Sequence, residues 1–208
     1  MELAAPKSVL IATGNKGKLR ELESMLSKFP VVLRSLVEFS DLVEVDEAGS
    51  SFQENAILKA RGYAAQAGLM TLADDSGLEV KCLDGAPGVL SARYAGDKAS
   101  DAERVTKLLN EITQAKDSDR RARFVCAIAI SDSNSNILAT FEGICEGQIA
   151  LTPRGVHGFG YDPVFIPVGY SESFGILSAG IKDKISHRGR ALHAASFFFN
   201  KLFESNAV

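Results

Sequence analysis

The stretch Leu72-Ala73-Asp74-Asp75-Ser76-Gly77-Leu78 places two adjacent carboxylates directly after an apolar run. The run, Leu69 to Ala73, predicts a buried strand, and unpaired charges at the edge of a core are costly in free energy. Metal binding and general-base catalysis are the two usual reasons for such a cost, and both need rigidly held carboxylates. A turn is the alternative interpretation, because Asp-Asp-Ser-Gly is also favourable turn sequence.

Strands and helices alternate on the N-terminal side of this stretch. Val9–Ala12 predicts a short buried strand, and the polar segment Thr13–Lys18 predicts a turn. Apolar residues at helical spacing between Leu19 and Leu26 indicate an amphipathic helix. After an acidic loop over residues 41–51, the alanine-rich segment Phe52–Ala67 favours a second helix that Gly68 ends.

Strands dominate the C-terminal side until a last helix. The capping-box pair Ser100 and Glu103 opens a predicted helix. Phe124–Ile130 and Ile137–Phe141 predict a hairpin, which a third strand over residues 144–150 extends, and residues 188–203 form the last helix. Because helices alternate with strands early and antiparallel strands come late, we predict the α/β class with a mixed sheet.

The bulk composition is that of a soluble globular protein. The 208 residues suit one domain, or one domain with two lobes sharing a sheet. A net charge of −3 argues against binding a nucleic acid polymer by phosphate neutralisation. The three scattered cysteines predict neither a zinc site nor a disulfide framework. We see no signal peptide and no apolar run of membrane-spanning length, so we expect a cytoplasmic location and no membrane partner.

An anion site is predicted where the first strand meets the first helix. Backbone amides and the positive helix end favour a phosphate at such a position. The glycines allow close approach, and a tight strand-to-helix connection is the alternative explanation for them. The candidate residues are Thr13, Gly14, Asn15, Lys16, Gly17 and Lys18.

Three further segments carry side chains suited to ligand binding. Asn55 and Lys59 lie four residues apart on one predicted helix face, and the preceding loop carries Asp46. The turn Gly158–Pro163 combines aromatic rings with glycines, which suits stacking on a base but also suits an ordinary structural turn. A cationic cluster precedes the last helix, where a solvated surface is the alternative; it contains Lys182, Lys184, His187, Arg188 and Arg190.

Together these features are the ones expected of a protein that binds a nucleoside triphosphate with Mg²⁺. On seven ordered segments the chain resembles the inosine triphosphate pyrophosphatase family, also called Ham1-like. The segments are Thr13–Lys18, Glu54–Ala60, Ala73–Leu78, Gly85–Val89, Ser91–Tyr94, Gly158–Pro163 and Ile185–Arg188.

The resemblance implies a fold, an activity and an assembly. The fold is ITPase-like (Maf/Ham1), with a mixed sheet in an elongated two-lobed single domain, residues 1–208, and flanking helices. The activity is Mg²⁺-dependent hydrolysis of ITP, dITP and XTP to the monophosphate and pyrophosphate. The assembly is a homodimer, for which Val125–Ile130 is either an interface or simply core.

The resemblance also implies roles for individual residues. Asp75 is the proton acceptor and a Mg²⁺ ligand, and Ser76 contacts substrate. Asp46 stands where the second metal carboxylate is expected, with Glu44 and Glu47 as alternatives. The segment Thr13–Lys18 binds the triphosphate. The base and sugar are flanked by Phe159, Gly160, Tyr161 and Asp162, and the pocket is closed by Lys182, His187 and Arg188.

Two other functions remain open at this point. One is a nucleotide sensor without catalysis, which the presence of Asp74, Asp75 and Lys18 disfavours. The other is a Maf-like pyrophosphatase for dTTP and UTP, against which the segments Phe159–Asp162 and Ser186–Arg188 argue.

Overall fold

A computed structural model describes residues 7–204 of the chain. It contains six strands and five α-helices, joined by loops that include four short 3₁₀ helices. In chain order the strands and α-helices are β1 (Lys7–Ala12), α1 (Lys16–Leu26), β2 (Val31–Ser35), α2 (Phe52–Ala67), β3 (Met70–Val80), α3 (Asp101–Gln114), β4 (Arg121–Ser131), β5 (Ile137–Ile149), β6 (Phe165–Pro167), α4 (Ala179–Ile185) and α5 (His187–Glu204).

The strands form one mixed six-stranded sheet in the order β2-β1-β3-β4-β5-β6. Strand β1 pairs in parallel with both β2 and β3, whereas β5 and β6 pair antiparallel. The predicted α/β class with a mixed sheet and flanking helices is therefore confirmed. Within residues 7–204, no helix combines the length and apolarity that spanning a membrane requires.

The chain forms two compact units. Within the described residues, the first unit comprises 7–75, 127–142 and 191–204. The second comprises Ser76–Cys126 and Gly143–Arg190. Strands β3, β4 and β5 contribute residues to both units, so neither unit is a continuous segment of chain.

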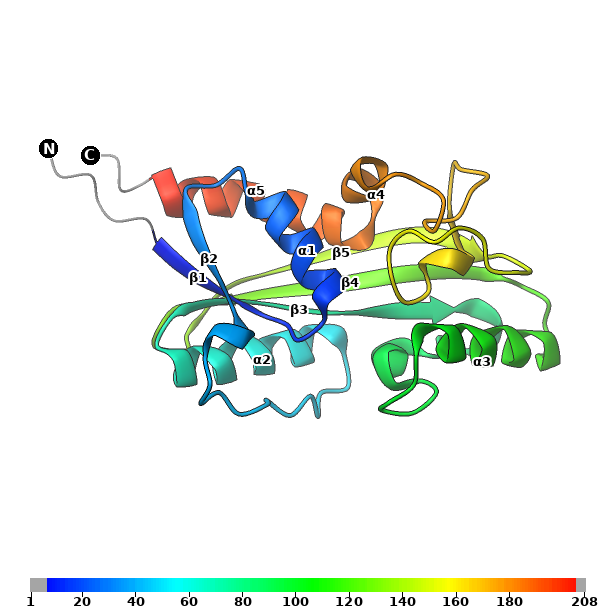
Figure 1. Cartoon of the computed structure of the whole chain (residues 1–208), viewed down its shortest axis with the longest axis horizontal. Helices are drawn as coiled ribbons and strands as arrows, with labels where there is room; N and C mark the ends of the chain where they lie inside the picture. Colours follow the sequence, from blue (N-terminus) through cyan, green and yellow to red (C-terminus); the bar gives the residue numbers. More distant parts are fainter. Residues whose placement is uncertain (1–6, 205–208) are drawn as a thin grey trace, which may run out of the picture. The chain divides into compact units, whose positions relative to one another are not determined.

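In the first unit, helices cover both faces of the sheet. Helix α2 lies on one face, and α1 and the later part of α5 lie on the other (Figure 1). The central strands carry apolar runs between these layers, and Leu10, Ile11 and Leu72 are completely buried. Two-sided burial explains the continuous apolar runs in the sequence of β1 and β3.

In the second unit, α3 packs its apolar side onto the core. Its buried residues Val105, Leu108 and Ile112 join one hydrophobic cluster with Phe124 of β4 and Phe165 of β6. The predicted capping box is present, because Ser100 and Glu103 each bond the other's backbone N–H.

The strand at Asp74 and Asp75 does not end where we predicted. Strand β3 runs from Met70 to Val80 and passes through both carboxylates. Leu78 and Val80 are fully buried, so apolar packing continues beyond the acidic pair. The turn interpretation of Asp-Asp-Ser-Gly is therefore wrong.

Two other predicted boundaries are also wrong. Residues 16–18, expected in a turn, form the first turn of α1, because Asn15 caps that helix. Residues 144–150, expected as a separate strand, mostly continue β5, which runs unbroken to Ile149. By contrast, α2 ends as predicted at Gly68, whose φ of +63° suits glycine.

Candidate active site

The two carboxylates in the middle of β3 are each held by a lysine of the first unit. Lys18 Nζ lies 2.7 Å from Asp74 Oδ1. Lys59 Nζ lies 3.2 Å from Asp75 Oδ1 and donates to the backbone oxygen of Asp74 at 2.9 Å. The exposed fractions of Asp74 and Asp75 are only 1% and 7%. Pairing with lysines from α1 and α2 is thus what allows two charges inside a strand.

Burial and pairing act in opposite directions on Asp75. Burial raises the pKa of Asp75 above its ordinary value, against the lowering effect of Lys59 and Lys18. Burial also disfavours the ammonium of Lys59, but Asp75, Glu47 and Asp74 outweigh it and raise the pKa of Lys59. Lys59 therefore stays charged at neutral pH, and Asp75 becomes a stronger base than an exposed aspartate.

One oxygen of this site has the surroundings expected of a metal ligand. Asp75 Oδ2 is buried and has no hydrogen-bond partner within the described part of the chain. Glu47 Oε2 lies 3.2 Å from Lys59 Nζ, the same ammonium that contacts Asp75. Glu47 thus belongs to this group, whereas Asp46 is exposed and makes none of the described contacts of the group.

The loop that carries Glu47 is fixed by Asn55 of α2. Asn55 is buried, and its Oδ1 accepts a hydrogen bond from Gly49 N at 2.8 Å. A Cβ at Gly49 would approach the same oxygen to 2.6 Å, so only glycine permits this contact. Asn55 and Lys59 do share one helix face, with Asn55 directed at the loop rather than at a ligand.

The donor set fits Mg²⁺ in its usual coordination. No group of three or more His, Cys, Asp or Glu side chains within residues 7–204 is arranged to hold a metal. Mg²⁺ does not require one, because it is commonly held by one or two carboxylates together with substrate phosphates. Asp75 and Glu47 supply two such carboxylates.

The predicted anion turn is organised by Asn15. Its Oδ1 accepts hydrogen bonds from Gly17 N at 2.8 Å and Lys18 N at 3.1 Å, and Asn15 N donates to Thr13 Oγ1. The side chain of Asn15 therefore occupies two amides that a phosphate would otherwise use. Gly14 and Lys16 are exposed, so the open part of this segment lies at Gly14, before the helix, and at Lys16, its first residue.

In the second unit, Asp162 organises the aromatic turn. Asp162 is 2% exposed, and its Oδ2 accepts hydrogen bonds from Phe159 N at 2.8 Å and from Lys182 Nζ. Lys182 Nζ in turn lies 4.7 Å from the centroid of the Phe159 ring. The structure thus brings together Phe159, Asp162 and Lys182, three residues predicted at the base pocket. The carboxylate of Asp162 is bound by protein groups, and not directed at a ligand.

The start of α5 contributes a buried arginine and a stacked histidine. Arg188 is 0% exposed, and its guanidinium donates to Ser76 Oγ at 2.9 Å and lies 5.8 Å from the Phe159 centroid. His187 stacks on Phe124 with a centroid distance of 4.6 Å. Arg188 therefore lies close to both Ser76 and Phe159 within the second unit.

Gly189 allows α5 to begin against α4. A Cβ at this position would lie 1.9 Å from the backbone oxygen of Asp183. The Asp183 oxygen is a backbone atom and cannot swing aside as the end of a flexible side chain can. No other residue therefore fits at position 189 without a shift of the backbone. The glycine thereby sets where the two preceding residues, His187 and Arg188, are placed.

Two polar residues to which the sequence analysis gave no role brace the aromatic turn. Ser91 is buried; its Oγ accepts from Leu78 N at 2.9 Å, and its backbone oxygen accepts from Tyr161 Oη at 3.0 Å. Asp101 of α3 accepts a hydrogen bond from Gly160 N at 2.6 Å. Ser91 stands out in the sequence only as part of the segment Ser91–Tyr94. Asp101 resembles any acidic residue in the first turn of a helix.

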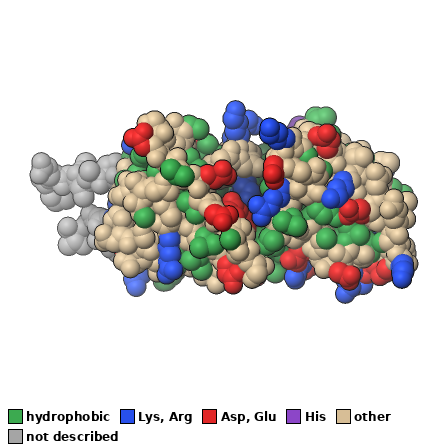
Figure 2. All heavy atoms as spheres, turned by 90° about the horizontal axis from the view of Figure 1, so that it is seen from below, with side chains coloured by type: hydrophobic (Ala, Val, Ile, Leu, Met, Phe, Trp, Pro, Cys, Tyr) green, Lys and Arg blue, Asp and Glu red, His purple; other side chains and the backbone are tan. Residues whose placement is uncertain are grey.

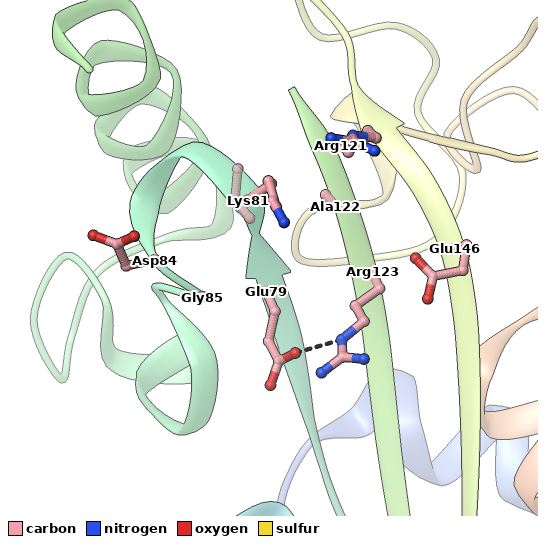
Figure 3. A pocket seen from close by; sticks show the side chains of 9 residues that line it. Glu79, Lys81, Asp84, Gly85, Arg121, Ala122, Arg123 and Glu146 are labelled. Atoms are coloured by element: carbon pink, nitrogen blue, oxygen red, sulfur yellow. Dashed lines mark hydrogen bonds and ion pairs between the residues drawn. The ribbon is translucent and has the colours of Figure 1, made fainter. Parts of the chain in front are cut away.

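A separate hollow on the sheet of the second unit lacks the character of a phosphate site. Its volume is about 520 Å³, and Arg123 and Glu79 form a 2.6 Å ion pair across it (Figure 3). Three basic and three acidic residues balance each other there. The lining consists of Glu79, Val80, Lys81, Asp84, Gly85, Arg121, Ala122, Arg123 and Glu146.

The face drawn in Figure 2 lacks the charge pattern that a polyanion would need. On the face drawn in Figure 2, basic side chains are interspersed with acidic ones and do not form a continuous basic field. Binding a nucleic acid polymer depends on neutralising many phosphates, which such a face does not provide.

Comparison with known proteins agrees with this site. The sequence profile of the Ham1 family matches residues 9–198. The chain belongs to the Ham1 family. The resemblance found from the seven sequence segments is therefore confirmed.

Relatives in the Ham1 family match over nearly their whole length. A protein of Bacillus licheniformis named dITP/XTP pyrophosphatase is 45% identical over 190 residues, which cover 91% of this chain and 96% of that protein. A Coxiella burnetii protein of the same name is 43% identical, with coverage of 94% and 98%.

Solved Ham1 structures share the fold. A HAM1 protein from Coxiella burnetii matches with a TM-score of 0.85 at 44% identity, covering 94% of this chain and 99% of that one. The Staphylococcus aureus Ham1 protein matches with a TM-score of 0.82 at 38% identity, covering 94% and 100%. The ITPase-like fold predicted from the sequence is thus confirmed.

Proposed function

We propose that this chain hydrolyses the deaminated purine nucleotides ITP, dITP and XTP to the nucleoside monophosphate and pyrophosphate. The observation that carries the proposal is the buried pair Asp74 and Asp75, held by Lys18 and Lys59 within a Ham1 chain. Relatives 43 to 45% identical are named dITP/XTP pyrophosphatases, which supports this substrate class.

Asp75 is the proposed general base. Water attacks the α-phosphorus, a new P–O bond forms, and the bond from that phosphorus to the bridging oxygen of the β-phosphate breaks. The attacking water gives its proton to Asp75, whose pKa burial raises toward the range useful for proton transfer. Pyrophosphate leaves with the bridging oxygen.

Asp75 and Glu47 are the proposed holders of Mg²⁺. The buried, unpartnered Oδ2 of Asp75 and the nearby carboxylate of Glu47 support this assignment. Asp46, predicted from the family pattern, remains an alternative on the same loop. When bound, Mg²⁺ would neutralise charge on the phosphoryl oxygens as that charge develops.

The second unit is proposed to recognise the base. Phe159 supplies an aromatic face for stacking, and His187 and Arg188 supply donors that match the 6-keto group of hypoxanthine or xanthine. Adenine carries a 6-amino group there, and a donor facing another donor remains unpaired, which penalises ATP. Ser76 follows Asp75 directly in β3, so base recognition and the proposed catalytic base are consecutive in the chain.

Assembly and location complete the proposal. We propose a homodimer, as the family resemblance implies, located in the cytoplasm, as the sequence analysis led us to expect. Val125–Ile130 is buried within this chain, so a dimer interface has to use other residues. Light scattering of the purified protein tests the dimer.

The decisive experiment measures pyrophosphate release from ITP, XTP, dITP, ATP, GTP and dTTP, with Mg²⁺ and with EDTA. Fast Mg²⁺-dependent release from ITP and XTP, with slow release from ATP and GTP, supports the proposal. Preference for dTTP would assign the chain a Maf-like substrate instead. Binding of ITP without turnover would indicate a sensor, and orthophosphate release would place the attack at another phosphorus.

A further inference from the structure

The aromatic turn of the second unit is clamped by two carboxylates from different elements. Asp162 Oδ2 accepts from Phe159 N at 2.8 Å, and Asp101 Oδ2 accepts from the next amide, Gly160 N, at 2.6 Å. Asp162 belongs to the turn itself, whereas Asp101 comes from the first turn of α3, about sixty residues earlier in the chain. Two consecutive amides are thus fixed by two separate acids.

The orientation of Asp101 is itself fixed. Its Oδ1 accepts from Arg104 Nη1, and Arg104 Nη2 donates to the backbone oxygen of Ala99. Each carboxylate oxygen of Asp101 therefore has its own partner, Arg104 for Oδ1 and Gly160 for Oδ2.

Capping of α3 does not explain this arrangement. Ser100 and Glu103 already form a reciprocal capping box at the same helix start. The Asp101 side chain is 49% exposed, so the bond to Gly160 is not needed to satisfy a buried charge. What the bond does achieve is to hold a turn that has little conformational preference of its own.

The turn requires external hydrogen bonds because a glycine lies on each side of Phe159. Gly158 and Gly160 have φ values of +75° and +59°, which glycine adopts readily and other residues disfavour, and glycine has the most backbone freedom to lose. Between them, Phe159 presents its ring to Lys182 at 4.7 Å and to Arg188 at 5.8 Å. Fixing the amides on either side of the Phe159 carbonyl fixes the plane on which a base would stack.

We propose that Asp101 is a positioning residue for nucleobase recognition, acting through the Gly160 amide on the Phe159 ring. This inference rests on the proposed function, since it presumes that a purine stacks on Phe159. Asp101 contacts no reacting atom in this scheme. Its loss should weaken interactions with the base and leave interactions with the phosphates unchanged.

The test compares Asp101→Asn and Asp101→Ala with Glu103→Gln. Glu103→Gln is the matched control, because it removes an acid from the same helical turn without touching the aromatic turn. For each variant, KM and kcat for ITP are measured together with competitive inhibition by inosine monophosphate and by inorganic triphosphate, which has no base. Thermal unfolding of each variant verifies that it is folded.

We expect both Asp101 variants to raise KM for ITP about tenfold and to weaken inhibition by inosine monophosphate by the same factor. The kcat for ITP and the inhibition by triphosphate should stay within twofold of wild type. Glu103→Gln should match wild type in every kinetic measure. Wild-type values for both Asp101 variants would overturn the inference, as would equal weakening by Glu103→Gln or equal loss of triphosphate binding. Absence of ITP turnover in the wild type would instead overturn the proposed function.

Discussion

Lys59 donates to Asp75 inside the protein, with its Nζ 3.2 Å from Asp75 Oδ1. The contact uses one carboxylate oxygen and leaves Oδ2 buried without a partner in residues 7–204. A lysine in this position favours the ionised carboxylate against the effect of burial and still leaves one oxygen for chemistry.

Asp75→Asn should abolish turnover while preserving substrate binding. The amide cannot accept the proton of water, and loss of a general base typically slows a reaction on the order of 10²- to 10⁴-fold. The measurement is pyrophosphate release from ITP, with ITP affinity determined separately by calorimetry. A variant that keeps more than a tenth of wild-type kcat would exclude Asp75 as the base.

In the Mg²⁺-free protein, Asp75 should titrate at a higher pH than an exposed aspartate, because burial raises its pKa above the ordinary value of 3.8. Lys59→Gln should move this titration further upward, since removing a nearby cation raises a carboxyl pKa, typically by about one to three units. Carbon NMR of the Asp75 carboxyl group, recorded against pH without Mg²⁺, measures both titrations. A titration that stays in place or moves downward in Lys59→Gln would contradict the proposed coupling.

Glu47→Gln and Asp46→Asn distinguish the two candidates for the second metal carboxylate. Glu47 shares Lys59 with Asp75, so Glu47→Gln should increase the Mg²⁺ concentration needed for half-maximal activity about tenfold or more. Asp46→Asn, the matched neutralisation one residue earlier, should leave it near the wild-type value. The reverse ranking of the two variants would return the role to Asp46.

Arg188→Lys should impair both base recognition and stability. A lysine keeps the charge but cannot reproduce the planar guanidinium that contacts Ser76 and faces Phe159. We expect KM for ITP to rise at least tenfold, and the free energy of unfolding to fall by about 1–3 kcal/mol because the site is fully buried. Chemical denaturation gives the second number, and an unchanged KM would remove Arg188 from base recognition.

Local sequence signals were sufficient for most of the fold. Helix α2 and the capping box of α3 follow from alanine content and Ser-x-x-Glu spacing, both of which act within a few residues. The course of β3 through Asp74 and Asp75 was not predictable in this way. The lysines that make those charges tolerable come from α1 and α2, and such pairings exist only after the chain has folded.

In the candidate site too, residues with a local sequence signal were predicted and residues that act through distant contacts were not. The aromatic turn and the Ser-His-Arg segment were identified because they carry unusual side chains in a compact stretch. Asp162 was expected to face the ligand, but its carboxylate binds Phe159 N and Lys182. Asp101 was not identified, and Ser91 was named only within the segment Ser91–Tyr94 without a role, since each acts on a turn far away in the sequence.

The close approach of Gly189 to Asp183 bears on how this protein can be redesigned. Libraries aimed at new nucleobases would naturally randomise the residues from His187 onward, because His187 and Arg188 are the proposed readers. Any side chain at position 189 would push the helix start away from Asp183 and displace both readers at once. Changing the specificity therefore has to proceed with one glycine held constant, whichever base is sought.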